Sequence, residues 1–323
     1  MQAIVHRVYG PAELLELRDL PMPAAGDDDV LVRVRAASVN AADWHTMRGE
    51  PYAFRLIAGL RAPRTPVLGR AVAGVVEAVG WSVTQFRTGD EVLAETDSGG
   101  FAEYTLVPQT QLAPKPASLS FEDAATLPVA GTTALQGLRD HGRLRSRQRV
   151  LINGASGGVG TFAVQIARAL GGQVTAVCST SKVDLVRSLG TEEVIDYTSE
   201  DFTRSGRHWD LIVDNAGTHS LSDLRRALTP GGTLVPSGGE AGGRWIGGAR
   251  RLVLARSLSP FVSQNLRPFI ATNRASDLIF LAELVATGQV TPVIERTYTL
   301  AEAPKAVDYV EQGHARGKVV ITV

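Results

Sequence analysis

The sequence VLINGASGGVG spans Val150 to Gly160. In it, a run of apolar residues enters a turn dense in glycine, and a helix-like segment follows at once. In that segment Ala163, Ile166 and Leu170 recur at the spacing of one helical stripe, which suits packing on a sheet. The stretch therefore predicts a strand, a tight turn and a helix in immediate succession.

The small residues of this turn match those of a dinucleotide-binding turn. Ala155, Gly157 and Gly160 occupy its three small-residue positions, with alanine in place of the first glycine. Small residues there permit a tight turn, close approach of the backbone to a pyrophosphate, and close packing of the helix on the strand. The pyrophosphate would bind the free N–H groups at the helix N-terminus. A loop that is merely rich in glycine is the alternative, and the flanking strand and helix argue against it.

The region around this turn alternates between apolar runs and helix-length segments. Such alternation predicts βαβ units and a parallel sheet covered on both faces. Residues Arg251 to Ala255, late in the region, look like a further strand that could pair edge to edge across a two-fold axis. The expected strands are residues 149–153, 173–178, 193–197, 211–214 and 232–236, and the expected helices are residues 161–170 and 182–189. Helical segments are also expected before each of the last two strands.

The first third of the chain has a different residue pattern. Residues 30–39 and 72–79 are rich in β-branched side chains and are bounded by glycines, which predicts short strands. A helix over 275–287 and strands over 297–300 and 318–323 resemble this part more than the middle. We therefore expect an α/β protein in which a doubly wound Rossmann domain, residues 123–267, is inserted into a mostly β, partly open barrel formed by residues 1–122 and 268–323.

Composition excludes several classes of protein. The chain has 323 residues with 33 basic and 33 acidic side chains, and this balance argues against a nucleic-acid partner. The basic residues between Arg244 and Arg256 are more typical of a solvated face or a subunit contact. The single cysteine, Cys178, excludes an intramolecular disulfide and suits a reducing compartment. No signal peptide precedes the first strand and no apolar run is long enough to span a membrane, so we expect a cytoplasmic protein.

The residues after the second expected strand indicate the cofactor. An NAD-binding site would place an acidic residue about 20 positions beyond the turn to hold the ribose 2′-hydroxyl. Here residues 176–182 read AVCSTSK and contain no carboxylate. Hydroxyls and Lys182 can instead receive a 2′-phosphate, which favours NADPH. The alternative is that Lys182 is only a solvated lysine at the start of a helix. Cys178 reads as a buried packing residue rather than a reactive thiol.

A metal site is not expected. Catalytic zinc needs three protein ligands, and the six histidines are scattered, with no pair at helical ligand spacing. Without a Lewis acid the chain is poorly equipped to reduce a simple ketone. A quinone or an α,β-unsaturated ketone is a better acceptor, because it takes hydride at a carbon remote from its oxygen.

Seven segments together carry a family resemblance. Their order and spacing resemble the medium-chain dehydrogenase/reductase superfamily, in its zinc-independent quinone oxidoreductase branch, and four shorter segments look most like the mitochondrial and chloroplast-envelope members. The resemblance covers nearly the whole chain and implies a GroES-like catalytic domain, a Rossmann domain and a homodimer. The seven segments are VNAAD (39–43), residues 69–80, GDEV (89–92), GFAEY (100–104), GTTA (131–134), residues 153–160 and HARGKVV (314–320).

The resemblance also implies a role for individual residues. Asn40 would lie beside the nicotinamide and would be catalytic, and Thr133 would face the nicotinamide ribose. The pyrophosphate would be lined by Ser156, Gly157, Gly158 and Val159, the adenosine ribose phosphate would be surrounded by Ser179, Lys182 and Tyr197, and further cofactor contacts would come from Asn215, Ser237, His314 and Arg316.

Two positions depart from the zinc-dependent pattern. Asn40 stands where zinc-dependent relatives carry a metal-binding cysteine, and Arg70-Ala71 follows Gly69 where they carry a His-Glu pair. We expect Arg70 to point outward as a surface residue. If it points inward, it could attract a carboxylate or carbonyl of the substrate.

The expected activity is therefore hydride transfer from NADPH to a quinone or conjugated enone. Tyr52 and His45 are candidate proton donors, and both also have an ordinary structural interpretation, as a packed aromatic ring and a hydrogen-bonded histidine. Two other functions stay open: a non-catalytic, redox-sensing NADPH-binding protein, and an enone reductase of specialised metabolism.

Overall fold

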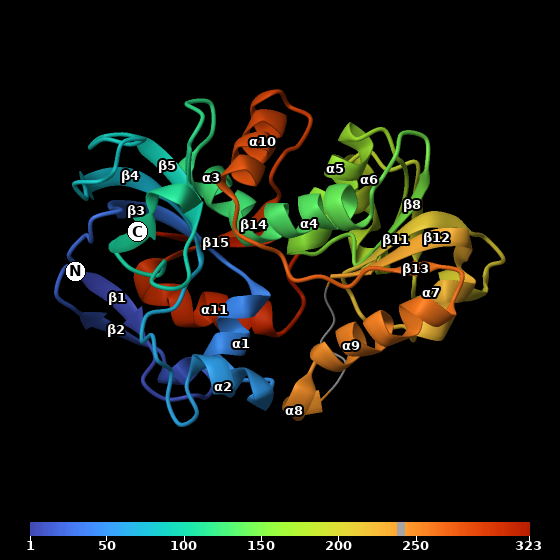
Figure 1. Ribbon diagram of the computed structural model, residues 1–323, viewed down its shortest axis with the longest axis horizontal. Coiled ribbons are helices and arrows are strands. Elements are labelled where there is room, and N and C mark those ends of the chain that lie inside the picture. The colour runs from blue at the N-terminus through green and yellow to red at the C-terminus, as the bar shows by residue number, and fades with distance from the viewer. Residues whose placement is uncertain (238–242) are drawn as a thin grey trace. The chain divides into compact units, whose positions relative to one another are not determined.

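The computed structural model describes residues 1–237 and 243–323. Two compact units are present, and the chain passes between them more than once. Unit 1 comprises Met1–Thr132, Thr272–Gly288 and Pro292–Val323, and unit 2 comprises Thr133–Ala271 and Gln289–Thr291. Each is described separately (Figure 1).

Unit 2 contains the expected parallel sheet. Its strand order is β10-β9-β8-β11-β12-β13, and every neighbouring pair is parallel. Numbered within the sheet this order is 3-2-1-4-5-6, that of a dinucleotide-binding Rossmann fold, and the order reverses at β8. The strands are β8 (Arg149–Asn153), β9 (Gln173–Cys178), β10 (Glu193–Asp196), β11 (Trp209–Asp214), β12 (Leu228–Pro236) and β13 (Asn265–Leu266).

Helices cover both faces of this sheet. Figure 1 shows α5 and α6 on one side and α7 and α9 on the other. In α5, every residue from Gly160 to Ala167 is buried, so the helix is enclosed well beyond the single stripe that its sequence predicts. The helices are α4 (Thr132–Gln136), α5 (Gly158–Ala169), α6 (Val183–Ser188), α7 (Leu221–Arg226), α8 (Gly243–Ile246) and α9 (Ala249–Leu258).

Two sequence-based expectations for this unit are wrong. Residues Arg251–Ala255 do not form a strand but lie inside α9, where Ala255 is buried and Val253 is exposed. A short apolar run does not by itself distinguish a strand from a helix, and here the helix continues to Leu258. In addition, the segment before β11 holds only a 3₁₀ turn, Phe202–Arg204, rather than a helix.

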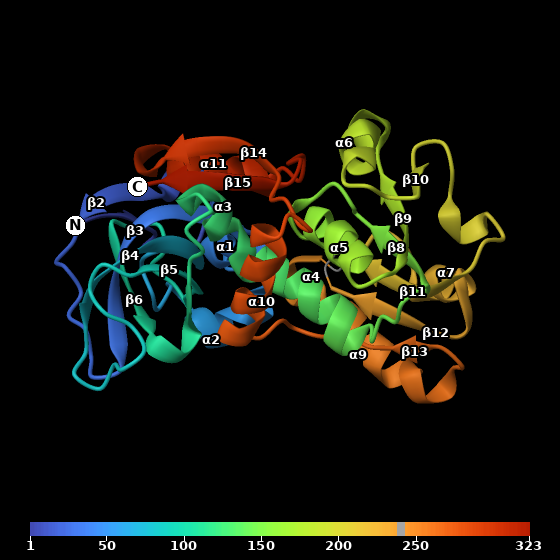
Figure 2. The same cartoon turned by 90° about the horizontal axis from the view of Figure 1, so that it is seen from above.

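Unit 1 is built around a seven-stranded sheet. Six strands follow the order β14-β15-β3-β4-β5-β7, and β6 also pairs with β3; β1 and β2 form a separate antiparallel hairpin. Figure 2 shows the C-terminal strands beside the N-terminal ones. The strands are β1 (Gln2–Val5), β2 (Glu16–Asp19), β3 (Asp29–Val39), β4 (Ala71–Val79), β5 (Glu91–Glu95), β6 (Tyr104–Pro108), β7 (Leu112–Pro114), β14 (Ile294–Thr299) and β15 (Lys318–Thr322).

The strand β3 organises unit 1. Residues 32–35 in its middle alternate, with Val32 and Val34 buried and Arg33 and Arg35 exposed, as in a strand with one covered face. Its last four residues are all buried, because β4 and β15 flank them. β3 is thus one long strand rather than several short ones. Asn40 follows its buried end and therefore lies in the interior. The helices of the unit are α1 (Ala41–Arg48), α2 (Arg55–Ala58), α3 (Phe121–Thr126), α10 (Ala275–Ala286) and α11 (Ala303–Glu311).

Neither unit contains, among the residues that the structure describes, a helix long and apolar enough to cross a membrane.

Candidate cofactor and catalytic sites

The turn between β8 and α5 has the shape that a phosphate site requires. Gly154 adopts a left-handed conformation with φ of 78°. A Cβ atom on Gly160 would lie 2.1 Å from the Gly154 carbonyl oxygen, so glycine is needed there to bring α5 against the strand. A Cβ atom on Gly157 would meet only the same oxygen, at 3.6 Å. Internal packing therefore explains Gly160 but does not explain Gly157.

The open position of Gly157 fits a bound pyrophosphate. Gly157 precedes the first residue of α5, a helix of 12 residues that begins without a side-chain cap. The first N–H groups of such a helix favour an anion, and a Cβ at this position would occupy the space that the anion approaches. Ser156 is buried beside it, while Gly158 and Val159 are partly exposed at the start of the helix.

Two polar side chains meet where β11 and β12 end. The Ser237 hydroxyl donates to the Asn215 carboxamide oxygen. Asn215 also lies against the turn, because a Cβ atom placed on Gly154 would be 3.5 Å from the Cβ atom of Asn215. Its Nδ2 is buried and has no acceptor among the described residues. Since a buried donor is rarely left unsatisfied, this amide fits a ligand bound at the turn.

Beneath these residues lies a buried polar network that the sequence did not reveal. Asn153 donates to Asp214 over 2.7 Å, and Arg251 from α9 forms an ion pair with the same carboxylate. The Gly217 N–H donates to it as well, over 3.2 Å. The network ties the ends of β8 and β11 together, and thus fixes the edge from which Asn215 projects.

The residues expected at the ribose phosphate lie at the ends of β9 and β10. Ser179 follows β9, and Lys182 ends the 3₁₀ turn that leads into α6. Tyr197 follows β10, and its N–H donates to the Cys178 carbonyl over 3.1 Å. The Tyr197 side chain is exposed and Lys182 is half-buried. The structure therefore brings these three side chains to one edge of the sheet.

A carboxylate also lies at this edge. Asp196 pairs with Cys178 across β10 and β9 and accepts hydrogen bonds from the hydroxyls of Thr180, at 2.6 Å, and Thr198, at 2.8 Å. These hydrogen bonds hold the pKa of Asp196 below its usual range. The absence of an acidic residue within residues 176–182 is therefore only part of the local electrostatics, because the strand pairing brings Asp196 to the same turn.

Cys178 does not have the environment of a reactive thiol. It is 2% exposed, and its burial, together with the nearby Asp196, raises its pKa to about 11. The thiol is therefore protonated at neutral pH, and a thiol is a much weaker nucleophile than a thiolate.

In unit 1, Asn40 is held from two sides. It lies between the end of β3 and the start of α1, and it is 6% exposed. Its Nδ2 donates to the Ser38 carbonyl over 2.9 Å, and its Oδ1 accepts from the Lys318 ammonium over 2.6 Å. Lys318 also donates to the Val39 carbonyl over 3.0 Å.

A buried acid balances this lysine. Asp43, in the first turn of α1, accepts from the Asn40 backbone N–H over 2.7 Å. Burial raises the pKa of Asp43 to about 6, against the opposing effect of that hydrogen bond and of Lys318 and Arg70. Burial lowers the pKa of Lys318 to about 8, and the Asp43 charge opposes the shift. Both residues lie in segments that carry the family resemblance, Asp43 in VNAAD and Lys318 in HARGKVV, but the sequence alone indicates no role for either of them.

Arg70 is intermediate between the two orientations considered, because its side chain is 37% exposed and yet forms an ion pair. Its guanidinium contacts the Glu95 carboxylate over 3.1 Å at the end of β5, and its Nε is buried without an acceptor among the described residues. Burial raises the pKa of Glu95, and the Arg70 charge opposes this. The local positive charge that the sequence suggested is therefore largely compensated by Glu95.

The two candidate proton donors differ in their surroundings. The ring of Tyr52 lies under the Arg55 guanidinium, 4.8 Å away, and is partly exposed. His45 packs against Trp44, and its Nδ1 lies 2.9 Å from the Glu50 carbonyl oxygen. Burial lowers the pKa of His45, so its ring is neutral at pH 7 and is a weak acid. Tyr52 is the better candidate of the two.

The remaining expected residues are not part of these clusters. Thr133 is half-buried in α4. His314 and Arg316 are exposed in the turn between α11 and β15, where the Arg316 N–H donates to Glu295 over 2.7 Å. Their side chains lie on the segment that leads to Lys318.

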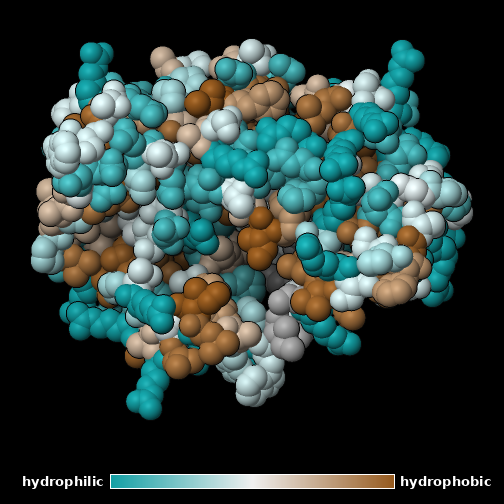
Figure 3. Space-filling view, in the orientation of Figure 1, coloured by the Kyte–Doolittle hydropathy of each residue, from teal (hydrophilic) through white to brown (hydrophobic). Residues whose placement is uncertain are grey.

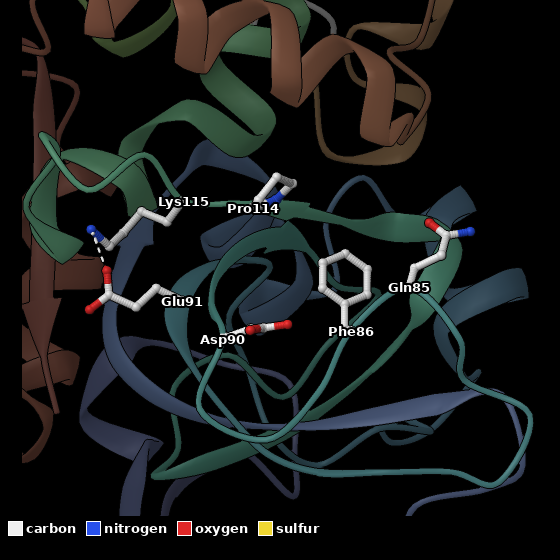
Figure 4. A pocket seen from close by; sticks show the side chains of 6 residues that line it. All are labelled: Gln85, Phe86, Asp90, Glu91, Pro114 and Lys115. Carbon is white, nitrogen blue, oxygen red and sulfur yellow. Dashed lines mark ion pairs between the residues drawn. The ribbon is translucent and has the colours of Figure 1, made fainter.

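A separate hollow of about 370 Å³ in unit 1 is not a candidate site. Figure 4 shows Lys115 turned toward Glu91 at its edge. The Lys115 ammonium contacts the Glu91 carboxylate at 2.9 Å and donates to the carbonyls of Pro116 and Leu119. An ammonium has three N–H groups, so none remains for a ligand. The hollow is lined by Gln85, Phe86, Asp90, Glu91, Pro114 and Lys115.

Within residues 1–237 and 243–323, no three His, Cys, Asp or Glu side chains are grouped so that they could hold a metal ion.

Comparison with known proteins identifies the family. A model described as "Alcohol dehydrogenase GroES-like domain" matches residues 26–117, and one described as "Zinc-binding dehydrogenase" matches residues 189–321. The words "zinc-binding" describe the family that the second model represents. Metal independence stays a prediction for this chain.

Relatives match along the whole length. The human "NAD(P)H oxidoreductase RTN4IP1, mitochondrial" is 37% identical over 360 residues, which cover 100% of this chain and 89% of that protein. The "Chloroplast envelope quinone oxidoreductase homolog" of Arabidopsis thaliana is 30% identical over 336 residues, covering 99% and 98%. Both names refer to organelles, so a cytoplasmic location stays a prediction.

A solved structure agrees with both units. The quinone oxidoreductase from Coxiella burnetii superimposes with a TM-score of 0.87 at 29% identity, covering 100% of this chain and 99% of that one. The GroES-like and Rossmann folds expected from the sequence are thus confirmed. The chain belongs to the medium-chain dehydrogenase/reductase superfamily, in its quinone oxidoreductase branch.

Proposed function

We propose that this protein is an NADPH-dependent oxidoreductase that transfers hydride to a quinone or an α,β-unsaturated ketone. The observation that carries the proposal is the turn at Gly157, where packing leaves open the space that a Cβ would fill, with the unsatisfied Asn215 amide beside it. Membership of the quinone oxidoreductase branch supports the same reaction class.

The residues of unit 2 would bind the cofactor. The N–H groups at the start of α5 hold the pyrophosphate, and the Asn215 amide donates to an acceptor on the bound nucleotide. Ser179, Lys182 and Tyr197 hold the 2′-phosphate, which only NADPH carries. Bound there, NADPH supplies the hydride.

The residues of unit 1 suit a conjugated acceptor. When hydride reaches a carbon remote from the oxygen, the product is an enolate or quinol anion that needs only a hydrogen bond and a proton. In our proposal Asn40 contacts the nicotinamide and Tyr52 donates the proton. Zinc-dependent relatives, by the resemblance, carry metal ligands at the positions of Asn40 and Arg70, and neither side chain here is a good zinc ligand.

An apolar surface beside Tyr52 supports a lipophilic substrate. The side chains of Leu56, Ile57 and Leu60, in and just after α2, are 69%, 73% and 68% exposed. Figure 3 shows a brown patch over this helix. Exposed apolar patches are characteristic of surfaces that bind something, and a quinone ring with an apolar tail fits one.

A turnover screen tests the proposal. The protein would be assayed with NADPH and NADH against quinones, enones and simple ketones, with and without exhaustive chelation. We expect NADPH oxidation with quinones or enones, little with simple ketones, and full activity after chelation. Tight NADPH binding without oxidation of any acceptor would support the non-catalytic redox-sensing alternative. Faster turnover of enones than quinones would favour the enone reductase, and activity restored specifically by zinc would overturn the metal-independent mechanism.

A further inference from the structure

Lys318 is a buried charge for which the proposed reaction has no role. It is 3% exposed, at the first position of β15, and is followed by the buried Val319 and Val320. Placing a charged side chain in an interior is costly unless hydrogen bonds and an opposite charge compensate it. A methionine of similar length would fill the same space without that cost. The lysine therefore needs an explanation beyond packing.

The sheet register explains how Lys318 reaches Asn40. β15 runs antiparallel to β3, with Val319 opposite Val39. The next position outward places Lys318 opposite Asn40, although 278 residues separate the two along the chain. Gly317, just before the strand, has φ of 84°, and a Cβ there would lie 2.3 Å from the Val293 carbonyl oxygen. The entry into β15 is thus closely constrained.

The two hydrogen bonds of the Asn40 side chain allow only one orientation of its amide. The Ser38 carbonyl can only accept and the Lys318 ammonium can only donate. Rotating the amide by 180° would place its NH₂ group against the ammonium and its oxygen against the carbonyl. In the observed orientation, one N–H and one oxygen lone pair of Asn40 are left over from these two bonds.

Asp43 makes a charged lysine tolerable at this place. Its carboxylate accepts from the Asn40 backbone N–H, and its Oδ1 has no donor among the described residues. The Asp43 charge favours the protonated form of Lys318, the form that can donate to both the Val39 and Asn40 oxygens. Asp43 thus supports Lys318, and Lys318 orients Asn40.

We propose that Lys318 is a positioning residue that locks the carboxamide of Asn40, so that one N–H and one lone pair are presented to the cofactor in fixed places. The inference rests on the proposed contact between Asn40 and the nicotinamide. It predicts that Lys318 acts through Asn40 and has little influence on cofactor binding when Asn40 is absent.

A double-mutant cycle tests this coupling. The variants are Lys318→Met, Asn40→Ala and the double mutant, with Lys305→Met as a control on an exposed lysine of the same chain. The measurements are the NADPH dissociation constant by fluorescence titration without substrate, and kcat and KM with a quinone. We expect Lys318→Met to lower kcat/KM by roughly 10- to 100-fold in the wild-type background, because a misplaced reacting group costs about that much. In the Asn40→Ala background the further loss should be less than twofold.

Lys318→Arg serves as the conservative variant, and we expect it to recover kcat/KM to within about fivefold of wild type, because arginine still donates to the same oxygens. Equal losses in both backgrounds, or no loss in the wild-type background, would overturn the proposal. A wild-type protein that binds NADPH but oxidises it with no acceptor would instead refute the proposed function. In that case the NADPH dissociation constants of the wild type, the two single mutants and the double mutant would alone decide whether Lys318 acts through Asn40.

A measurement on the wild type covers the case in which Lys318→Met does not fold. Selective ¹⁵N labelling of asparagine resolves the side-chain amide of Asn40, with the exposed Asn265 as an internal reference. In a locked amide, the proton bonded to Ser38 should exchange at least 10-fold more slowly than those of Asn265, whose amide donates to the Gly231 carbonyl at an exposed position. Equal exchange rates at the two residues would contradict the lock.

Discussion

The half-buried Lys182 is the residue on which cofactor choice should depend most. Hydrogen bonds to charged groups contribute about 1.5–3 kcal/mol, and the partial solvent exposure of Lys182 favours the lower end. We therefore expect Lys182→Ala to raise the KM for NADPH by about 10-fold, to leave the KM for NADH nearly unchanged, and to preserve kcat. Paired titrations with both cofactors measure this. Equal losses for NADPH and NADH would mean that Lys182 acts on folding or on general binding.

Asp196 opposes Lys182 at the same edge of the sheet. Its lowered pKa keeps the carboxylate charged at neutral pH, so it repels a 2′-phosphate. Asp196→Asn removes the charge and keeps one oxygen that can accept from Thr198, although the acceptor for Thr180 is lost. We expect the ratio of kcat/KM for NADPH to that for NADH to increase severalfold. A fall in this ratio would show that the carboxylate organises the phosphate site rather than opposing it, and Asp184→Asn, on an exposed part of α6, is the control.

Contacts between single residues were the least predictable part of the site. The small residues of the turn at 154–160 could be recognised because their roles depend on neighbours within a few positions. The contact between Lys318 and Asn40 depends on the register of two strands at opposite ends of the chain, and no local pattern encodes it. The same holds for Arg70, whose partner Glu95 is 25 residues away across a strand pair.

At the scale of elements, two glycines at the turn into α5 should have different roles. Gly160 is needed for packing, and Gly157 for binding the cofactor. Gly160→Ala places a Cβ 2.1 Å from a backbone oxygen, so α5 must shift, and we expect a loss of more than about 2 kcal/mol in the free energy of unfolding. Gly157→Ala meets nothing closer than 3.6 Å and should fold normally. It should nevertheless weaken both NADPH and NADH by at least 10-fold, because its methyl group occupies the pyrophosphate space. Urea unfolding and cofactor titration measure the two effects, and normal cofactor binding by Gly157→Ala would contradict the proposed phosphate site.

The junction of β15, β3 and α1 should give a measurable dependence of stability on pH. The pKa of Lys318 is about 8 in the folded protein and 10.5 in its ordinary state. Between these values the unfolded chain holds a proton that the folded chain has lost, so the free energy of unfolding rises with pH. Burial causes the shift of the Lys318 pKa and the Asp43 charge opposes it, while Arg70 and Glu95 act on the pKa of Asp43.

Lys318→Met removes this dependence, while every other titrating group is common to both proteins. We expect the wild type to gain stability relative to the variant as pH rises from 8 to 10. Urea unfolding at three pH values in this range measures the difference. A constant difference across the range would contradict a lowered pKa for Lys318.

Helices and strands were predictable where their pattern was long. The periodicity over residues 161–170 extends for nearly three turns, and α5 forms there. The run from Arg251 to Ala255 is only five residues long, and its apolar side chains suit either structure. Its neighbours decide the outcome, since the segment from Ala249 to Leu258 contains no glycine or proline and continues as one helix.

At the scale of the whole molecule, the order of the strands follows from local rules. Most connections in unit 2 join parallel neighbours, and the exception, from β10 to β11, crosses back over β9 and β8. The resulting reversal at β8 places the turn at the edge where ligands bind in such sheets. The GroES-like unit was harder to derive, because antiparallel strands far apart in the chain, such as β3 and β15, pair without a connecting helix. The residue pattern predicted a mostly β, barrel-like sheet, and the resemblance of motifs along the whole chain supplied the GroES-like assignment.

The whole molecule should be a homodimer, although the strand on which that expectation depended is a helix. The segment around α9 leaves several large apolar side chains in solvent: Val253 is 63% exposed, Leu254 43%, Leu258 38% and Phe261 84%. Exposed apolar side chains of this size along one segment are characteristic of an interface, and a two-fold axis could bury them against a second copy. Light scattering at micromolar concentration should therefore give about twice the chain mass of 34.3 kDa. Val253→Glu combined with Leu254→Glu should reduce the mass to that of one chain, because the axis brings like charges together, whereas Ile270→Glu, an exposed apolar position outside α9, should leave the dimer intact. A wild-type mass of one chain would refute dimerisation, and a dimer that persists in the double variant would place the interface elsewhere than α9.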